Sequence, residues 1–549
     1  MLGWLLSVIA FALVACEVST APETVSPPTA ATPSVAALAT AAPTQPPTPT
    51  VEVPAERGTT DASPIEGGTL IAGALTDAKT LNSILAADAT SRDVTFLLGN
   101  RLINVKPDLM PEGDLADSWS VSADGLKITF TLKRGVKFHD GHDLTAEDVK
   151  FTYDSILNPL KASPFHPLLA DYWAAPNAIK VIDAYTVEFN YARPKADTLV
   201  YDFGVSILPK HILGDVSAKD FGSAEFNTQK PIYSGPFMFK EWVKGDHLTL
   251  EANPNYFKGK PRLGAYIVKV YPQLTSLLGP LRAGEIDWGA LDPGQMADAK
   301  QLARVTTYAY PTFKSTYYAY QLDPTKSTLF QDKRVRQALL YAVDRRAIIA
   351  RRLFGYGDIA PTTIAPHSWA SSAAVQSLYP FDPDKAKTLL TEAGWTAGVT
   401  TDGVRVKDGK RFSFTLLTNA DNRVRADAIV EMQRYWKDVG VESKPQTDEW
   451  NAFLKRIGAT PDSAHDFDIF VVGFNWSIDP NQKLMWHSAS IQNGVNFNPY
   501  KNAELDKLLD DGYATFNLSE RKALYAKAQQ LLADDVPSVV LFFEQATGG

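Results

Sequence analysis

Cysteine is almost absent from this sequence. Cys16 is the one cysteine among 549 residues, so an internal disulfide and a zinc site built from several thiolates are both excluded. Positive charge is also scarce, because 54 Lys and Arg residues stand against 62 Asp and Glu residues and give a formal net charge of -8. Nucleic-acid phosphates are bound by basic surfaces. The charge balance therefore predicts a soluble protein with no nucleic-acid partner.

The common catalytic motifs are missing as well. No G-x-S-x-G nucleophile elbow, phosphate-binding loop or nicotinamide-binding fingerprint is evident. The sequence predicts a protein that is not an enzyme and holds no cofactor. An extracytoplasmic hydrolase stays open as an alternative, because paired carboxylates for glycoside hydrolysis are identified only by their separation in space.

One short stretch has the residue types of a metal site. It holds His139, Asp140, His142 and Asp143. Their spacing gives neither two histidines at i and i+4 on a helix nor a zinc signature. The pattern therefore predicts that this stretch is a structural loop without a metal.

The N-terminal residues indicate export. Residues 1–15 are apolar, too short to span a bilayer as a helix of the mature protein, and run into the sequence LVAC at residues 13–16. Small residues followed by a cysteine predict a lipoprotein signal peptide, with Cys16 as the lipidated first residue of the mature chain. A truncated membrane anchor or a wrongly assigned start are the alternatives.

Residues 16–66 differ in composition from the rest of the chain. They are rich in Pro, Thr and Ala and contain almost no large apolar side chains. Such a segment cannot bury enough surface to fold, and its prolines keep it extended. We expect a disordered tether that holds a folded body in the periplasm or on the outer face of the cytoplasmic membrane.

The pattern is most specific in residues 114–156. The turn at residues 122–125 ends in Asp-Gly, which suits a tight hairpin. Apolar and polar residues then alternate over residues 127–132, as in a half-buried strand. Thr145 is placed to cap a helix whose first turn contains Glu147 and Asp148. Val149, Thr152, Tyr153 and Ile156 would form its buried face.

This stretch resembles the signature segment of the family 5 solute-binding proteins of ABC importers, a group that includes oligopeptide, dipeptide and nickel receptors. The resemblance is carried by WSVS at 119–122, DGL at 124–126, LKRGVKFHDG at 132–141 and LTAEDV at 144–149. Similar tracts follow at 233–237, 253–261 and 281–288.

The resemblance implies a two-lobed α/β architecture, the periplasmic-binding-protein type II fold in its large three-subdomain (cluster C) variety. Lobe I would comprise residues 67–312 and lobe II residues 313–549. Family members continue from their last strand back into lobe I for several tens of residues. We therefore expect that the C-terminal return to lobe I is missing, either because the gene product is truncated or because the sequence is a fragment.

The same resemblance suggests where a ligand would bind. Trp450 matches a position where dipeptide receptors place an indole against their ligand, and Trp476 lies at a strand tip where those receptors hold charge. Asn419 and Ser477 stand where dipeptide receptors have an arginine and an aspartate, although Asp479 and Arg423 lie close by. Weaker candidates follow the first strand: Asp88, Thr90 and Ser91.

These departures bear on the ligand. A buried ligand terminus without a counter-charge is costly, so a free dipeptide is disfavoured. The sequence predicts a monomeric receptor that captures a solute, in first place a longer peptide, and delivers it to a membrane permease of an ABC transporter. An oligosaccharide or a metal chelate is the alternative ligand. A sensor module on a stalk is an alternative role.

Overall fold

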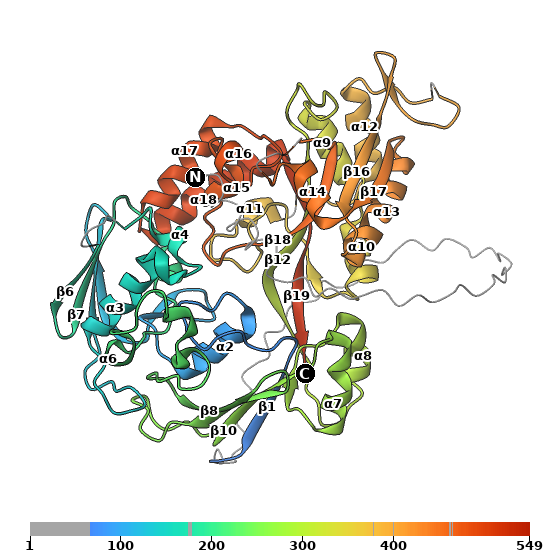
Figure 1. Cartoon of the computed structure of the whole chain (residues 1–549). Helices are drawn as coiled ribbons and strands as arrows, with labels where there is room; N and C mark the ends of the chain where they lie inside the picture. The colour runs from blue at the N-terminus through green and yellow to red at the C-terminus, as the bar shows by residue number, and fades with distance from the viewer. Residues whose placement is uncertain (1–65, 174–177, 377, 399, 461–462, 464) are drawn as a thin grey trace.

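The computed structural model describes residues 66–549 except 174–177, 377, 399, 461, 462 and 464. The predicted signal peptide, Cys16 and all but the last residue of the predicted tether lie outside the described residues. The chain forms two lobes, one from the blue to green segments and one from the yellow to red segments (Figure 1). Both contain helices packed on sheets, which confirms the predicted two-lobed α/β fold.

Lobe I contains two separate sheets. The first is mixed and has the order β11 (Trp288–Gly289), β1 (Thr69–Ala74), β10 (Ala265–Val270), β9 (His247–Ala252) and β8 (Phe237–Val243). The second is antiparallel and has the order β4 (Ala116–Val121), β5 (Lys127–Leu132), β7 (Thr186–Asn190) and β6 (Ile179–Asp183). Side chains from both sheets join in one apolar core.

The predicted hairpin and capped helix form as expected in lobe I. Gly125 adopts a positive φ of 69° in the turn, and Ile128, Phe130 and Leu132 of β5 are buried. Helix α3 (Ala146–Leu157) begins with a capping box. The Thr145 side chain accepts a hydrogen bond from a backbone N–H of the first turn, and the Asp148 side chain accepts one from the backbone N–H of Thr145. Its predicted apolar face is buried.

Lobe II is built on one six-stranded sheet. The order is β13 (Gly357–Asp358), β19 (Ser538–Gly548), β12 (Tyr308–Tyr320), β18 (Ile469–Asn475), β16 (Ser413–Asn419) and β17 (Glu442–Asp448). Successive residues of a strand point to opposite faces. On β12, Tyr318 and Tyr320 enter the core on one face of the sheet, whereas Tyr317 and Ala319 enter the core on the other.

Helices cover both faces of this sheet. On one side lie α9 (Lys333–Tyr341), α10 (Arg345–Arg352), α12 (Pro383–Glu392) and α13 (Arg423–Asp438). On the other lie α14 (Trp450–Ile457), α15 (Lys483–Trp486), α17 (Ala503–Ala514) and α18 (Leu518–Asp535). The remaining α-helices among the described residues are α2 (Ala89–Leu98), α4 (His166–Leu169), α5 (Thr198–Tyr201), α6 (Lys210–Leu213), α7 (Leu278–Ala283), α8 (Met296–Ala299), α11 (Ala373–Gln376) and α16 (Ser490–Asn493). Two short hairpins complete the list: β2 (Ile103–Val105) with β3 (Pro111–Gly113), and β14 (Val406–Lys407) with β15 (Lys410–Arg411).

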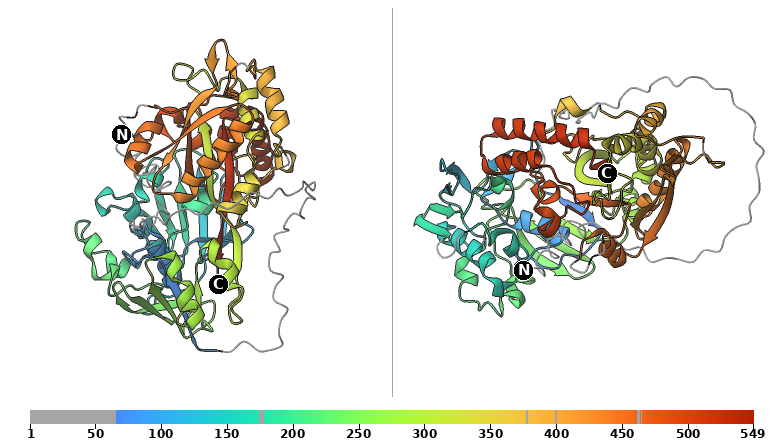
Figure 2. Two further views of the ribbon diagram at one scale, coloured as in Figure 1. Left: turned by 90° about the vertical axis from the view of Figure 1, so that its right-hand side faces the viewer. Right: turned by 90° about the horizontal axis from the view of Figure 1, so that it is seen from above.

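The long strands β12 and β19 run antiparallel between the lobes (Figure 2). Tyr308 pairs with Gly548 at the lobe I end, and Ala319 pairs with Ser538 at the lobe II end. Gly289 of β11 exchanges backbone hydrogen bonds of 3.1 and 3.2 Å with Gly549. The predicted boundary at 312/313 therefore falls within β12. This boundary stays a prediction.

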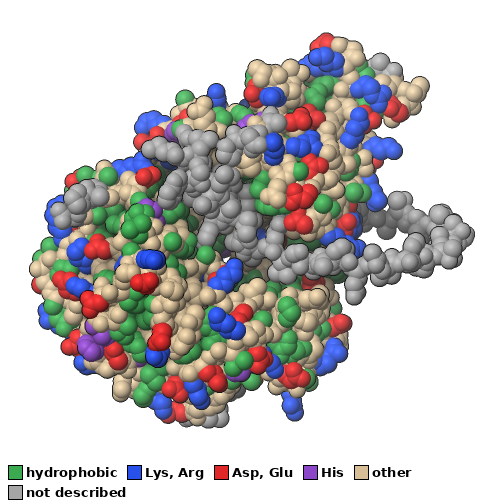
Figure 3. Space-filling view, in the orientation of Figure 1, with side chains coloured by type: hydrophobic (Ala, Val, Ile, Leu, Met, Phe, Trp, Pro, Cys, Tyr) green, Lys and Arg blue, Asp and Glu red, His purple; other side chains and the backbone are tan. Residues whose placement is uncertain are grey.

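The visible surface carries acidic and basic side chains side by side (Figure 3). Within the part of the chain that the structure describes, no helix combines the length and apolar character needed to cross a membrane.

Gly235 shows how closely the segments of lobe I approach each other. Its N–H donates to the carbonyl of Leu98 at 2.8 Å, and its own carbonyl accepts from the Asn253 side chain at 3.0 Å. A Cβ at this position would lie 2.4 Å from the Leu98 oxygen and 2.6 Å from the Gly99 nitrogen. The end of α2 can pack here only because residue 235 has no side chain.

We expect Gly235→Ala to lower the free energy of unfolding of lobe I by about 1–3 kcal/mol, because backbone atoms would have to move apart. Urea unfolding followed by circular dichroism measures this. Gly222→Ala is the matched control, since no atom lies within 4 Å of its added Cβ. Equal unfolding midpoints for the two variants would contradict the close packing at Gly235.

Candidate functional site

A pocket opens in lobe II beside the start of its crossing strand. It is small, because only about 10 Å³ of it is accessible to a water-sized molecule. The apolar side of the lining comes from Phe313, Ile364, Ala365, Trp476 and Pro480. The polar side comes from Thr363, Ser368, Ser477, Asp479, Asn481 and Gln482. Of the predicted site residues, Trp476, Ser477 and Asp479 are thus brought together here.

Trp476 is positioned by the two neighbouring strands β18 and β12. Its backbone N–H donates to the carbonyl of Phe313 at 2.9 Å, which extends the pairing of the strands by one residue. Its indole N–H donates to the Ser315 hydroxyl at 2.7 Å. The indole also contacts the Phe474 ring, with 4.5 Å between the ring centroids. One half-buried aromatic surface is therefore held in a fixed orientation at the pocket.

Neutral polar groups also line the pocket. The Thr363 hydroxyl donates to the Gln482 side-chain oxygen at 2.5 Å, and the Trp486 indole donates to Thr363 at 3.0 Å. The hydroxyl oxygen of Ser477 is buried and has no hydrogen-bond partner among the described residues. A buried polar group without a partner is costly. A hydrogen bond between Ser477 and a bound ligand stays a prediction.

Asp479 is neutralised within the protein. Its two carboxylate oxygens each accept a hydrogen bond of 2.8 Å from the Arg521 guanidinium, on α18. Both side chains are almost fully buried. Burial raises the pKa of Asp479, and Arg521 opposes that rise. Of the described lining residues, Asp479 alone bears a charge, so the pocket presents a compensated ion pair instead of a free carboxylate.

The lobes touch beside this pocket. Asn481, in the pocket wall, donates through its side-chain nitrogen to Asp197 of lobe I at 3.4 Å. The backbone N–H of Ala196 donates to the carbonyl of Tyr513 on α17 at 3.0 Å. Asp197 is in turn 3.0 Å from the buried Lys195 ammonium. The pocket therefore lies next to a polar contact between lobe I and lobe II.

Asn419 lies away from the pocket lining, at the end of β16. It is fully buried, and its side-chain oxygen accepts from Arg425 Nε at 3.0 Å. Its side-chain nitrogen donates to Asp421. Arg423 is the nearby candidate to replace the arginine that dipeptide receptors have at the position of Asn419. Its side chain is 94% exposed and lies 3.9 Å from Asp427. The buried arginine at this strand end is therefore Arg425, which sequence reasoning missed.

The other predicted contacts are spread over two elements. Trp450 begins α14 and stacks on Phe453, with 5.8 Å between ring centroids. Asp88 caps α2 by accepting from the Ser91 N–H at 2.8 Å. Thr90 contacts the Thr76 hydroxyl and carbonyl at 3.0 Å each. Their role in ligand binding stays a prediction, because these residues do not line the pocket.

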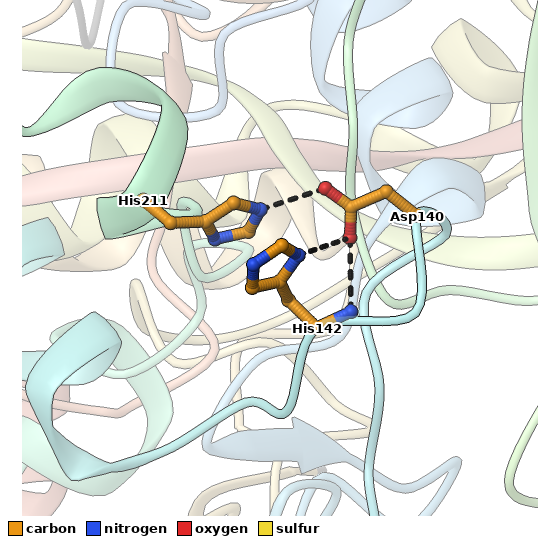
Figure 4. Close-up of side chains that lie close together, drawn as sticks. All are labelled: Asp140, His142 and His211. Atoms are coloured by element: carbon orange, nitrogen blue, oxygen red, sulfur yellow. Dashed lines mark hydrogen bonds and ion pairs between the residues drawn. The ribbon is translucent and has the colours of Figure 1, made fainter.

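The predicted structural loop at 139–143 acquires a residue from elsewhere in the sequence. His211 of α6 lies beside Asp140 and His142 (Figure 4). Sequence analysis did not connect this histidine with the loop, because they are 71 positions apart. The sequence alone predicts no metal at this loop. The structure adds the His211 imidazole to Asp140 and His142, so that three groups able to bind a metal lie together.

We predict that Arg521→Met lowers the free energy of unfolding by about 3–5 kcal/mol, because it leaves the Asp479 carboxylate buried without its partner. The double variant Asp479→Leu/Arg521→Met should recover much of that loss. Urea unfolding of the four members of this double-mutant cycle measures both effects.

The control for this cycle is Lys507→Met, which removes the exposed ion pair of Lys507 with Asp511 on α17. It should change the free energy of unfolding by less than about 1 kcal/mol. If Arg521→Met were no more destabilising than this control, the compensated ion pair would not be a main feature of the site.

Known proteins match this chain over most of its length. A family model described as bacterial extracellular solute-binding proteins, family 5 Middle, matches residues 110–496. The oligopeptide-binding protein AppA of Bacillus subtilis is 35% identical over 497 residues, which cover 87% of this chain and 87% of that protein.

Solved structures agree with this. AppA from Bacillus subtilis in complex with a nonapeptide has a TM-score of 0.64 and 34% identity, covering 88% of this chain and 95% of that one. NikZ from Campylobacter jejuni in complex with Ni(L-His) has a TM-score of 0.66 and 26% identity, covering 87% of this chain and 93% of that one. The resemblance seen in residues 114–156 is thus confirmed, and the chain belongs to the bacterial extracellular solute-binding proteins of family 5.

Proposed function

We propose that this protein is the receptor of an ABC importer and captures oligopeptides between its two lobes. The observation that carries the proposal is the pocket at Trp476, whose one charged lining residue among those described is already paired with Arg521. Family membership and the nonapeptide bound by AppA support a peptide as the ligand class.

Charge compensation favours an oligopeptide over a free dipeptide. A dipeptide brings an ammonium and a carboxylate close together, and each needs a counter-charge when it is buried. Asp479 already binds Arg521, and the buried Arg425 does not line the pocket but donates to Asn419. Interior residues of a longer peptide bring no terminal charges, and their backbone groups need only hydrogen bonds of the kind that Ser477 can supply.

The lining of the pocket would receive a side chain of the ligand. In this structure about 10 Å³ of the pocket is accessible to solvent, which is room for about one water molecule. The lining side chains would therefore move apart to admit a large apolar or aromatic side chain, which would pack on the Trp476 indole. The remainder of the peptide would extend between the lobes.

Ligand binding would favour the closed arrangement of the lobes. A ligand shifts an equilibrium only through contacts that differ between the two states. A peptide touching Trp476 of lobe II and the facing part of lobe I makes such contacts, and Asn481 with Asp197 would close the interface beside it. The membrane permease would recognise the closed form.

The proposed location follows from Cys16 and from the Pro-, Thr- and Ala-rich residues that follow it in the sequence. Lipid on Cys16 would hold a monomer on the outer face of the cytoplasmic membrane or in the periplasm, and the tether at 16–66 would give the folded body the reach to meet its permease.

Titration calorimetry tests the ligand class. We expect a nonapeptide with aromatic side chains to bind, and an excess of a dipeptide, an oligosaccharide or Ni(L-His) to leave that binding unchanged. Displacement of the nonapeptide by any of these three would contradict the proposal.

Trp476→Ala should weaken nonapeptide binding by about tenfold or more, since buried aromatic anchors carry a large share of binding energy. Trp476→Phe should retain part of the affinity. The matched control is Trp288→Ala in lobe I, which removes a tryptophan that is 41% exposed on β11, and it should bind as the wild type does. Unchanged binding by Trp476→Ala would remove this pocket from the ligand site.

Labelled palmitate should be incorporated into the protein in cells, and Cys16→Ala should abolish incorporation, because the thiol is the acceptor of the lipid. Labelling that persists in Cys16→Ala would contradict the lipoprotein assignment.

A further inference from the structure

We propose that Asp140, His142 and His211 form a binding site for a divalent transition-metal ion, with Zn²⁺ as the best-matched ion, on the surface of lobe I. One ligand atom from each residue lies within 4.8 Å of the other two. None of the three lines the pocket at Trp476, so this site and the proposed peptide site are independent.

Both imidazoles face the same carboxylate (Figure 4). His211 Nε2 lies 2.7 Å from one oxygen of Asp140, and His142 Nδ1 lies 3.6 Å from the other. The two imidazole rings are stacked, with 3.9 Å between their centroids and 16° between their planes. Nitrogen and oxygen donors thus converge from three side chains on one small region.

The backbone around these side chains fixes their positions. Asp140 and His142 lie in a tight loop in which Phe138 donates its N–H to the His142 carbonyl at 2.8 Å. Gly141 has a φ of 90°, which lets the loop turn between the two ligands. An Asp140 oxygen also accepts the His142 N–H at 3.1 Å, which orients the carboxylate.

His211 is brought to the loop by a separate contact. The preceding residue, Lys210, donates its N–H to the Asp148 carboxylate at 2.9 Å and its ammonium to Glu147 at 2.8 Å. Both acidic residues lie in the first turn of α3. The start of α6 is thereby held against the start of α3, close behind the loop.

The donor set selects the class of ion. Two imidazoles and one carboxylate suit Zn²⁺ and related first-row ions, whereas Ca²⁺ and Mg²⁺ prefer oxygen donors throughout. Zinc sites with three protein ligands leave a fourth position for water, and the solvent exposure of all three residues allows this.

Binding would replace contacts that the side chains now make with one another. The ion would take the place of the hydrogen bond between Asp140 and His211, and the stacked rings would turn so that both nitrogens point at the ion. The His142 side chain is 63% exposed and can rotate without disturbing the core. The bound ion would join the loop to α6 and stabilise lobe I.

Titration of Zn²⁺ into chelator-treated protein without a histidine tag tests the site. We expect about one equivalent of Zn²⁺ to bind per chain and to raise the melting temperature. His142→Ala/His211→Ala should abolish both effects, and Asp140→Asn should weaken binding by about tenfold or more. Ca²⁺ should have no effect on the melting temperature.

His247→Ala is the matched control. His247 is also a surface histidine of lobe I beside carboxylates, 2.9 Å from Asp246 and 3.7 Å from Glu241, but it does not belong to the converging group. This variant should bind Zn²⁺ as the wild type does. If His247→Ala abolished binding, or if His142→Ala/His211→Ala left it unchanged, the assignment would be overturned.

A second readout covers the case in which a variant folds poorly. Co²⁺ bound to the wild-type protein should give visible absorption bands of a site with nitrogen and oxygen donors, and Zn²⁺ should displace it. Absence of such bands together with absence of a Zn²⁺-dependent melting shift would refute the site, whatever the variants do.

Discussion

The antiparallel pairing of β12 with β19 is the constraint on which the rest of this structure depends. The two strands carry the chain between the lobes, and their pairing extends from Tyr308 with Gly548 to Ala319 with Ser538. Because side chains alternate along a strand, β12 supplies tyrosines to both cores of lobe II. The same strand carries Phe313 and Ser315, which hold Trp476 through its backbone and its indole. Strand β12 therefore contributes to the connection between the lobes, to the core of lobe II and to the pocket.

The buried pair of Asp479 with Arg521 decides what the pocket can bind. A lone carboxylate in this place would attract a ligand ammonium. With the guanidinium bound through two hydrogen bonds of 2.8 Å, the aspartate is compensated and the pocket offers aromatic surface and neutral polar groups. Arg521 comes from α18, one of the helices that lie toward lobe I, and α17 beside it contributes the contact between Tyr513 and Ala196. Charge compensation and the contact between the lobes are therefore carried by the same helix pair.

Local patterns predicted the elements well, because caps, turns and apolar periodicity act over a few residues. The cap at Thr145 and the alternating strand at 127–132 both form as the sequence indicates. The site was harder to predict, since its partners are far apart in sequence. Asp479 with Arg521 and Asp140 with His211 are 42 and 71 positions apart, and no local pattern connects them. Trp476, Ser477 and Asp479 were placed together because three residues after one strand stay close in any fold.

The central claim is that this family 5 receptor carries oligopeptides, and its ligand in the cell tests that claim most directly. The measurement is mass spectrometry of small molecules released by denaturing protein that was purified under native conditions from its own cells. The account predicts peptides longer than dipeptides, enriched in aromatic or large apolar residues. Release of an oligosaccharide, a metal chelate or dipeptides alone would contradict it.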